Sequence, residues 1–307
     1  MNPMRQHAGM ALVITLWFIA LLALLALGFS NAMRTDTLVS RNLVDHIKAR
    51  HLAAAAVEKG IHSLLNPDQA VLNLLISGAS TEFTLGDAEL SIRLQDENGK
   101  LNINYAPVEL IENLLVTLGV EEEAALAISH AVGDWRDEDD LKQLYGAERR
   151  EYVDAGMHWM PSNAPFRSIG ELRHVMGINP SVYKSIAPLI TVYGNSENIN
   201  PLFASRTLLE AMPGIDTAEL QNYIEARQSL SEEQDPTALP PLTSVESLES
   251  EQVGPVYSVF GRAQLRSGTI ATRRLVVWIP EENLGRPYFI LDSGLDQPPA
   301  KSGEDEK

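Results

Sequence analysis

The stretch that decides the fold is residues 5–29, which reads RQHAGMALVITLWFIALLALLALGF. From Met10 to Phe29 the chain carries no charge, and a helix of that length crosses the hydrocarbon core of a bilayer. A secretory signal peptide is the main alternative, but its apolar region is usually shorter and ends at a small-x-small cleavage site. Because this run is long and continues into a helical pattern, the sequence predicts a retained transmembrane segment.

Charge sets the expected orientation of that segment. Arg5 and His7 precede it, and the whole chain has 24 Lys+Arg against 41 Asp+Glu, a net charge of −17. Positive residues stay on the cytoplasmic side, so we expect a cytoplasmic N-terminus and an acidic remainder across the membrane. The chain has no cysteine, which excludes disulfides and thiol catalysis. The acidic balance argues against a broad phosphate-binding surface.

The helical pattern continues well beyond the apolar run. After Pro3 the next proline is Pro67, and apolar residues recur on one side of a helix at Val39, Leu43, Ile47, Ala54, Val57, Ile61 and Leu64. One helix from Met10 to Leu65 would be about 80 Å long, with one half in lipid and the other on a globular head. A break at Gly28 into an anchor and a separate packed helix is the alternative.

Strand patterns occur in two places that lie far apart in the chain. They cover residues 82–85, 88–94, 256–265, 269–279 and, as an edge strand, 288–291. Turn signals at Gly86-Asp87 and at Arg266-Ser267-Gly268 make each of the first two pairs a hairpin. The residues between the two groups are helical with many breaks. Since a sheet has to close across that segment, we expect a helical insertion into an α+β head.

Three glycine turns inside the helical block suggest an internal repeat. Gly119, Gly177 and Gly214 each precede an apolar residue and lie between helical stretches, as in a helix-hairpin-helix unit. Asn102-Ile103-Asn104 and Asn198-Ile199-Asn200 precede two of the units, and their asparagines are expected to cap the helices.

Hairpins of this kind often bind DNA through backbone amides, so a membrane-anchored DNA receptor is the alternative function. Glu121 and Asp216 place acidic residues at two of the three turns, where phosphate is repelled. We therefore favour structural pairing of the helices and expect no nucleic acid partner.

The segment DWRDEDD, residues 134–140, is the main candidate site, and Gly146-Ala147-Glu148 follows it. So many carboxylates repel one another unless they are spread in solvent or neutralised by a cation, and calcium accepts six to eight oxygen ligands. The spacing is not that of an EF-hand. From the residues alone, a calcium loop and a solvated acidic loop both remain open. No His-Glu-x-x-His helix or Gly-x-Ser-x-Gly turn occurs, so we do not expect an enzyme.

At the N-terminus, RQHAG followed by MALVITL resembles the leader and mature start of type IV pilins and type II secretion pseudopilins. In those families a membrane prepilin peptidase cuts after the glycine and methylates the new N-terminus, which implies cleavage between Gly9 and Met10. Most members carry a glutamate five residues after the cut, where this chain has Ile14. That departure suits the K-type minor pseudopilins of type II secretion systems.

The resemblance implies an α+β pseudopilin fold with a long N-terminal helix, a small antiparallel sheet and a large inserted α-helical domain. The expected parts are a leader (1–9), a transmembrane segment (10–29), the periplasmic half of the helix (30–66), a head (67–104 and 252–292), the inserted domain (105–251) and a disordered tail (293–307). Members of the family bind calcium in the helical domain. Carried over residue by residue, the implied ligands are Asp134, Asp137, Asp139, Asp140 and Glu148. Arg149 stands where members often have another acid, so a second ion is not implied.

The resemblance also implies a function and a cellular location. A K-type pseudopilin would cap and nucleate the pseudopilus from the inner membrane, with its C-terminal domain in the periplasm. The implied partners are the I- and J-type minor pseudopilins, the major pseudopilin and the prepilin peptidase, together with a secreted protein or the outer-membrane channel.

Overall fold

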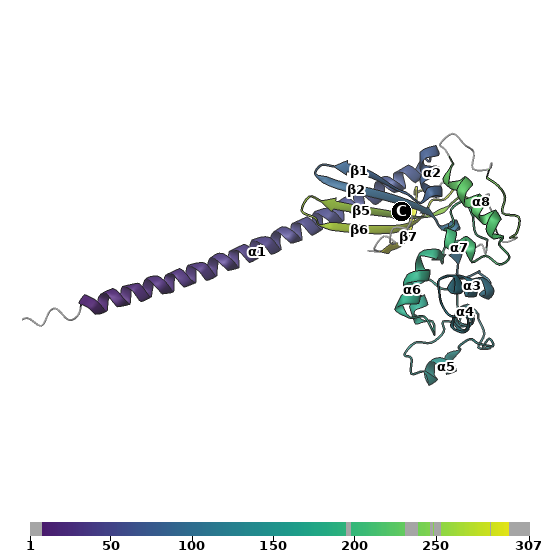
Figure 1. The fold of residues 1–307 in the computed structure, drawn as a ribbon, viewed down its shortest axis with the longest axis horizontal. Helices are drawn as coiled ribbons and strands as arrows, with labels where there is room; N and C mark the ends of the chain where they lie inside the picture. Colours follow the sequence, from purple (N-terminus) through teal and green to yellow (C-terminus); the bar gives the residue numbers. More distant parts are fainter. Residues whose placement is uncertain are drawn as a thin grey trace, which may run out of the picture.

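The computed structural model describes residues 8–194, 198–230, 239–245, 248, 253–282 and 284–294 of the chain. Its α-helices are α1 (Ala8–Leu65), α2 (Gln69–Ser77), α3 (Val108–Thr117), α4 (Glu122–Arg136), α5 (Arg149–Asp154), α6 (Pro180–Ile186), α7 (Arg206–Glu210) and α8 (Thr217–Gln228). The strands are β1 (Ser80–Leu85), β2 (Ala88–Asp96), β3 (Leu101–Asn102), β4 (Ile190–Thr191), β5 (Val256–Leu265), β6 (Ile270–Trp278) and β7 (Phe289–Gly294). Three short 3-10 helices are η1 (Glu97–Gly99), η2 (Ile169–His174) and η3 (Ala187–Leu189). This mixture of helices with one small antiparallel sheet confirms the α+β class (Figure 1).

The long helix is continuous. α1 passes through Gly28 without a break and projects from the head as a single rod (Figure 1). Its segment Leu12–Ser30 is long and apolar enough to cross a membrane, and none of that segment is buried within the molecule. Further along, Val39 and Ile47 are exposed, whereas Val57 is buried. The apolar stripe therefore covers the head only with its last turns and leaves the preceding turns open.

The head is a five-stranded antiparallel sheet in the order β1-β2-β5-β6-β7, with α1 lying across one face. Alternate residues of the central strands, such as Leu90 and Val259, point toward the helix and form a core with its buried side chains. Gly261 lies where the helix crosses β5, and a Cβ added there would overlap the backbone oxygen of Ala53. The absence of a side chain at this position lets the helix backbone approach the strand closely.

The strands agree with the alternation in the sequence. β5 has the expected bounds, β6 lies within the expected 269–279, and Gly86-Asp87 forms the turn between β1 and β2. β7 is the expected edge strand and continues to Gly294, two residues into the segment expected to be a tail. Residues 295–307 lie outside the described part of the chain. The helix α2 between α1 and β1 had no counterpart in the sequence analysis.

The helical segment leaves the sheet and returns to it at one place. β2 ends at Asp96, β5 begins at Val256, and Asp96 pairs with Tyr257 across the two strands. The Asp96 carboxylate accepts hydrogen bonds from the amides of Asn98 (2.9 Å) and Gly254 (2.6 Å), and so connects the outgoing and returning chains. Segments far apart in the sequence are thereby fixed side by side at the junction.

A buried ion pair lies next to Asp96. Glu97 accepts hydrogen bonds from the ammonium of Lys100 (2.6 Å) and from the hydroxyl of Ser258 (2.6 Å), and all three residues are buried. An unpaired charge in such a position would be strongly destabilising, so the three groups depend on one another. The junction between sheet and insertion is thus held by polar contacts that exclude water.

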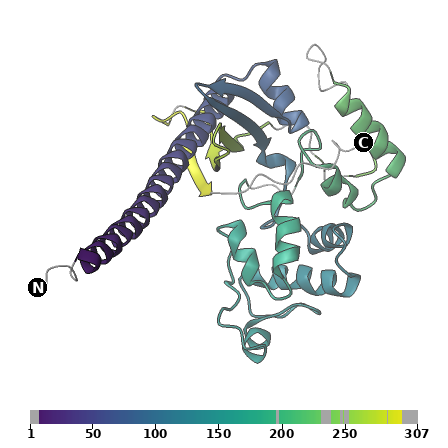
Figure 2. The same ribbon diagram turned by 60° about the vertical axis from the view of Figure 1, so that its left-hand side comes forward.

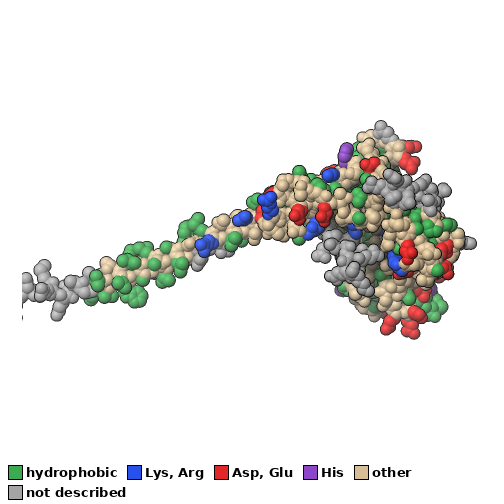
Figure 3. Space-filling model, turned by 45° about the horizontal axis from the view of Figure 1, so that its top comes forward, with side chains coloured by type: hydrophobic (Ala, Val, Ile, Leu, Met, Phe, Trp, Pro, Cys, Tyr) green, Lys and Arg blue, Asp and Glu red, His purple; other side chains and the backbone are tan. Residues whose placement is uncertain are grey.

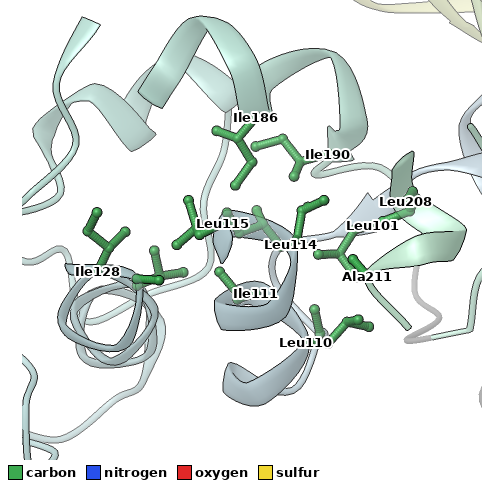
Figure 4. Close-up of a cluster of buried hydrophobic side chains, with 14 of the residues drawn as sticks. Leu101, Leu110, Ile111, Leu114, Leu115, Ile128, Ile186, Ile190, Leu208 and Ala211 are labelled. Atoms are coloured by element: carbon green, nitrogen blue, oxygen red, sulfur yellow. The ribbon is translucent and has the colours of Figure 1, made fainter. Parts of the chain in front are cut away.

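The inserted helices have a hydrophobic core of their own. Leu114 and Leu115 of α3 are fully buried and face Ile128 of α4 and Ile186 of α6 (Figure 4). The short strands β3 and β4 pair in parallel and connect this core to the junction. In Figures 1 and 2, α3–α6 lie beside the sheet rather than on it, with α5 at the end farthest from the strands.

The expected hairpins are found only in part. Gly119, Gly177 and Gly214 all have positive φ values, as their turns require. The segments before the second and third of these glycines in the chain are the 3-10 helix η2 and the five-residue α7, so a repeated helix-hairpin-helix unit is not confirmed.

The expected asparagine caps are wrong for two helices. α3 begins after Pro107 without a side-chain cap, and α7 is capped by Ser205. Asn104 lies four residues before the start of α3. Its side chain instead makes two hydrogen bonds with the backbone of Phe166. Asn179 caps α6, although no cap was predicted there.

Candidate functional site

The acidic site is built on the last turn of α4. Asp134 is fully buried, and its Oδ1 accepts a hydrogen bond from the amide of Gln143 (3.0 Å). Two glycines allow this contact. A Cβ at Gly146 would overlap the Asp134 carboxylate, and one at Gly133 would overlap the side chain of Gln143. The loop after α4 therefore folds back tightly over the helix, with Asp134 beneath it.

Three of the five predicted ligands carry buried oxygens that have no hydrogen-bond partner. These atoms are Oδ2 of Asp134, Oδ1 of Asp137 and both carboxylate oxygens of Glu148. Buried polar atoms are almost always satisfied in folded proteins, so an orphaned set of carboxylate oxygens needs an explanation. A bound cation is one, because it replaces the lost hydration with direct coordination.

The pKa values of the same three groups are all raised. Burial, and then repulsion from Asp134, Asp137 and Asp140, raises the pKa of Glu148 to about 7. Burial is also the largest cause that raises the pKa values of Asp134 and Asp137, and for Asp137 the charges of Asp134 and Asp139 add to it. Ionisation of these carboxyl groups is thus unfavourable unless a positive charge is bound beside them.

Asp139 and Asp140 lie at the exposed rim of the site, and their side chains already have partners. Asp139 accepts a hydrogen bond from the amide of Leu141 (2.7 Å), and Asp140 accepts one from the side chain of Asn163 (3.0 Å). Asn163 and Gly133 are part of this arrangement and were missed in the sequence. The position of Gly133 inside a helical pattern could have indicated its role. Nothing in the sequence near Asn163 indicated its contact with Asp140.

The predicted ligands do not enclose a metal site as they stand. Within the described ranges, no three His, Asp or Glu side chains form a group that could hold a metal ion. The donors are nevertheless of the kind that suits calcium, since they are carboxylate oxygens on a loop and no thiol is present. Trp135 is buried and stacks on Phe166 at 5.9 Å between ring centroids, so it belongs to the core.

The predicted processing site lies at the start of α1. Gly9 and Met10 are in its first turn, and residues 1–7 of the expected leader fall outside the described part of the chain. Ile14, at the position where most pilins have glutamate, is an exposed side chain on the apolar segment. No carboxylate therefore occupies that position of the helix.

Comparison with known proteins gives consistent results. A family model described as "Type II secretion system (T2SS), protein K" matches residues 88–195. The type II secretion system protein K of Klebsiella pneumoniae is 26% identical over 249 residues, 74% of this chain and 75% of that protein. Its counterpart in Pseudomonas aeruginosa is 29% identical over 158 residues, 48% of this chain and 47% of the relative.

A solved structure shows the same fold. The crystal structure of the GspK-GspI-GspJ complex from the enterotoxigenic Escherichia coli type 2 secretion system contains a chain that matches with a TM-score of 0.56 and 18% identity, over 85% of this chain and 98% of that one. At this identity the match shows a shared fold. Residues 88–195 match the family of type II secretion system protein K, and the Klebsiella relative of that name aligns with 74% of this chain.

Proposed function

We propose that this chain is a minor pseudopilin that caps the tip of a type II secretion pseudopilus and nucleates its assembly, as a structural component rather than an enzyme. The inserted helical domain carries the proposal. It projects beside the sheet as a second body with its own core, far wider than the rod of α1 (Figure 2). A subunit with such a body has no room for another head above it, which suits the end of a filament.

Ile14 supports the tip position by a separate argument. A lone carboxylate in hydrocarbon costs several kcal/mol unless it is paired. In the pilin family the glutamate at this position pairs with the N-terminal amine of the subunit above. A subunit with nothing above it has no such amine to pair with, so an apolar side chain is the stable choice.

The same proposal includes a cellular location and protein partners. The segment Leu12–Ser30 would anchor the chain in the inner membrane, with the leader in the cytoplasm and the head in the periplasm. The exposed turns of α1 around Val39, Leu43 and Ile47 would pack against the helices of I- and J-type minor pseudopilins and of the major pseudopilin. A secreted protein or the outer-membrane channel would meet the tip.

Calcium belongs to the proposal as well. Asp134, Asp137 and Glu148 would supply buried oxygens, and Asp139 and Asp140 would complete the shell from the rim after their side chains release their present hydrogen bonds. The ion would neutralise the repulsion among these groups and fix the loop on α4. Its role would be structural, since it would hold the end of the inserted domain in one shape.

Processing by a prepilin peptidase tests the proposal. Co-expression with the peptidase should remove residues 1–9, and intact mass spectrometry should find a chain that begins at a methylated Met10. The variant Gly9→Leu should remain uncut. An unprocessed wild-type chain, or equal cleavage of the variant, would remove this chain from the pseudopilins.

DNA binding, the alternative function, gains no support from the hairpin turns. Glu121 and Asp216 are the N-cap residues of α4 and α8, where they would face a phosphate. If the chain bound duplex DNA at low salt and lost it steeply as salt increased, this assignment would have to be reversed.

A further inference from the structure

The charge of the chain is concentrated in one part of it. Residues 105–251 contain 25 Asp+Glu and 9 Lys+Arg, a net charge of −16, whereas the other residues contain 16 and 15, a net charge of −1. In Figure 3 hydrophobic side chains coat the outer part of α1, and acidic side chains are visible on the head. The inserted domain is therefore the acidic part of a protein that is otherwise nearly neutral.

Large apolar side chains are exposed in the loop between α4 and α5, at the far end of this acidic domain. Leu141 is 76% exposed, Leu144 78% and Tyr145 54%, all within one short loop between α4 and α5. We call these three residues the distal patch. α5, the helix that follows the loop, lies at the end of the domain farthest from the sheet in both ribbon views (Figures 1 and 2).

The loop that carries the distal patch is fixed at several points. Lys142 forms an ion pair with Glu151 of α5 (3.1 Å), and the amide of Gln143 is bound by Asp134. Tyr145 packs edge-on against the ring of His130 at 5.7 Å between centroids. Because Lys142 and Gln143 between the leucines and Tyr145 after them are held, the two leucine side chains are presented outward by an ordered backbone. Exposed apolar groups on a fixed surface are typical of interaction sites.

We propose that the distal patch docks a segment of another protein in which apolar side chains stand beside lysine or arginine. The apolar groups would cover Leu141 and Leu144, and the net negative charge of the inserted domain would attract the basic groups. Charge also argues against two other binding partners of this patch, a second copy of the chain and an anionic membrane. A second copy of this chain would bring a domain of net charge −16 against an equal one, and an anionic membrane surface would be repelled in the same way. This docking surface is distinct from α1, which the proposed assembly uses.

A peptide-binding measurement with the full chain tests the proposal. The chain is held in nanodiscs of zwitterionic lipid, and the probe is a fluorescent peptide that alternates leucine and lysine, with empty nanodiscs subtracted. Two further probes replace its leucines by serine or its lysines by glutamate. We expect saturable binding of the first probe, at least tenfold weaker binding of either other probe, and weaker binding at high salt.

Variants of the chain locate the binding. The double variant Leu141→Ser and Leu144→Ser should weaken binding of the leucine-lysine peptide about tenfold. The control Leu85→Ser removes a side chain that is 51% exposed at the end of β1 and should leave binding unchanged. Thermal melting shows whether each variant is folded. Equal binding to the patch variant and the wild type would overturn the proposal, and so would self-association of the chain that only the patch variant loses.

Discussion

At position 148 a carboxylate is only 6% exposed and has no hydrogen-bond partner for either oxygen. Burial and the charges of Asp134, Asp137 and Asp140 raise its pKa to about 7. A buried charge beside other charges of the same sign destabilises the fold, whereas the same charge beside a cation stabilises it. One side chain thus has opposite effects on stability with and without metal, and this makes Glu148 the most informative residue of the site.

Replacement of Glu148 by glutamine should reverse the effect of calcium. In chelator the variant should melt a few degrees above the wild type, because the amide ends the repulsion. With calcium the wild type should gain several degrees and the variant little or nothing, since binding stabilises only a chain that retains the ligand. Melting of both proteins with and without calcium measures this.

The matched control for Glu148→Gln is Glu138→Gln, an exposed carboxylate in the same acidic segment and outside the predicted ligand set. It should melt like the wild type and keep the full response to calcium. If chelator and calcium leave the melting of the wild type unchanged, the acidic loop is only solvated and the proposed metal site is wrong.

At the scale of the elements, the head depends on how closely α1 lies on β5. A Cβ at Gly261 would overlap backbone of the helix, which cannot move alone, whereas a Cβ at Gly60 would lie 2.7 Å from a side-chain methyl of Val259. Side chains can turn aside at small cost, but a displaced helix loses contact with the whole sheet. The two glycines of this contact should therefore tolerate alanine to different degrees.

Gly261→Ala should destabilise the head by about 2 kcal/mol, and Gly60→Ala by less. Gly28→Ala is the control, since nothing lies within 4 Å of the position and alanine favours a helix. Urea unfolding, followed by tryptophan fluorescence and by circular dichroism, measures the three effects. The close-approach account fails if Gly261→Ala is as stable as Gly28→Ala.

The junction between sheet and insertion predicts a dependence of stability on pH. Burial, and to a smaller degree the charge of Glu97, raises the pKa of Asp96 to about 7, against hydrogen bonds from the amides of Asn98 and Gly254 that lower it. The ordinary value is 3.8, so between the two values the folded chain holds a proton that the unfolded chain releases. Stability therefore falls as the pH rises through this window.

Asp96→Asn should melt at a lower temperature, because it exchanges an acceptor for a donor opposite the amide of Gly254. It should also lose part of the decrease in melting temperature between about pH 4 and about pH 7. Both chains should carry Glu148→Gln, since Glu148 titrates in the same range. Asp87→Asn, on the exposed β1–β2 turn, serves as the control. An unchanged pH slope in Asp96→Asn would contradict the assignment.

At the scale of the whole molecule, the sequence predicted those elements that depend on residues close together in the chain. β5 was expected with its exact bounds because apolar and polar residues alternate along it, and α1 because its stripe has helical spacing. The junction could not be predicted, since Glu97 meets Ser258 across 161 positions of the chain. The acidic site was predicted as residue types in one segment, but its division into buried and rim carboxylates depends on how the loop folds onto α4.

The fold therefore places a broad acidic body at the end of a rod whose first part is long and apolar enough to cross a membrane, with an apolar stripe left open along the rod. In the proposed filament, a subunit of this shape would fit at one end only. The proposed capping function therefore depends on the position of the inserted domain along the filament.

Labelling of assembled pseudopili tests the tip assignment most directly. Filaments formed with an overproduced major pseudopilin are decorated with gold-labelled antibody against the inserted domain, residues 105–251, and viewed by electron microscopy. The account predicts label at one end of a filament and none along its length, and no label in cells that lack this chain. Label distributed along the filaments would contradict it.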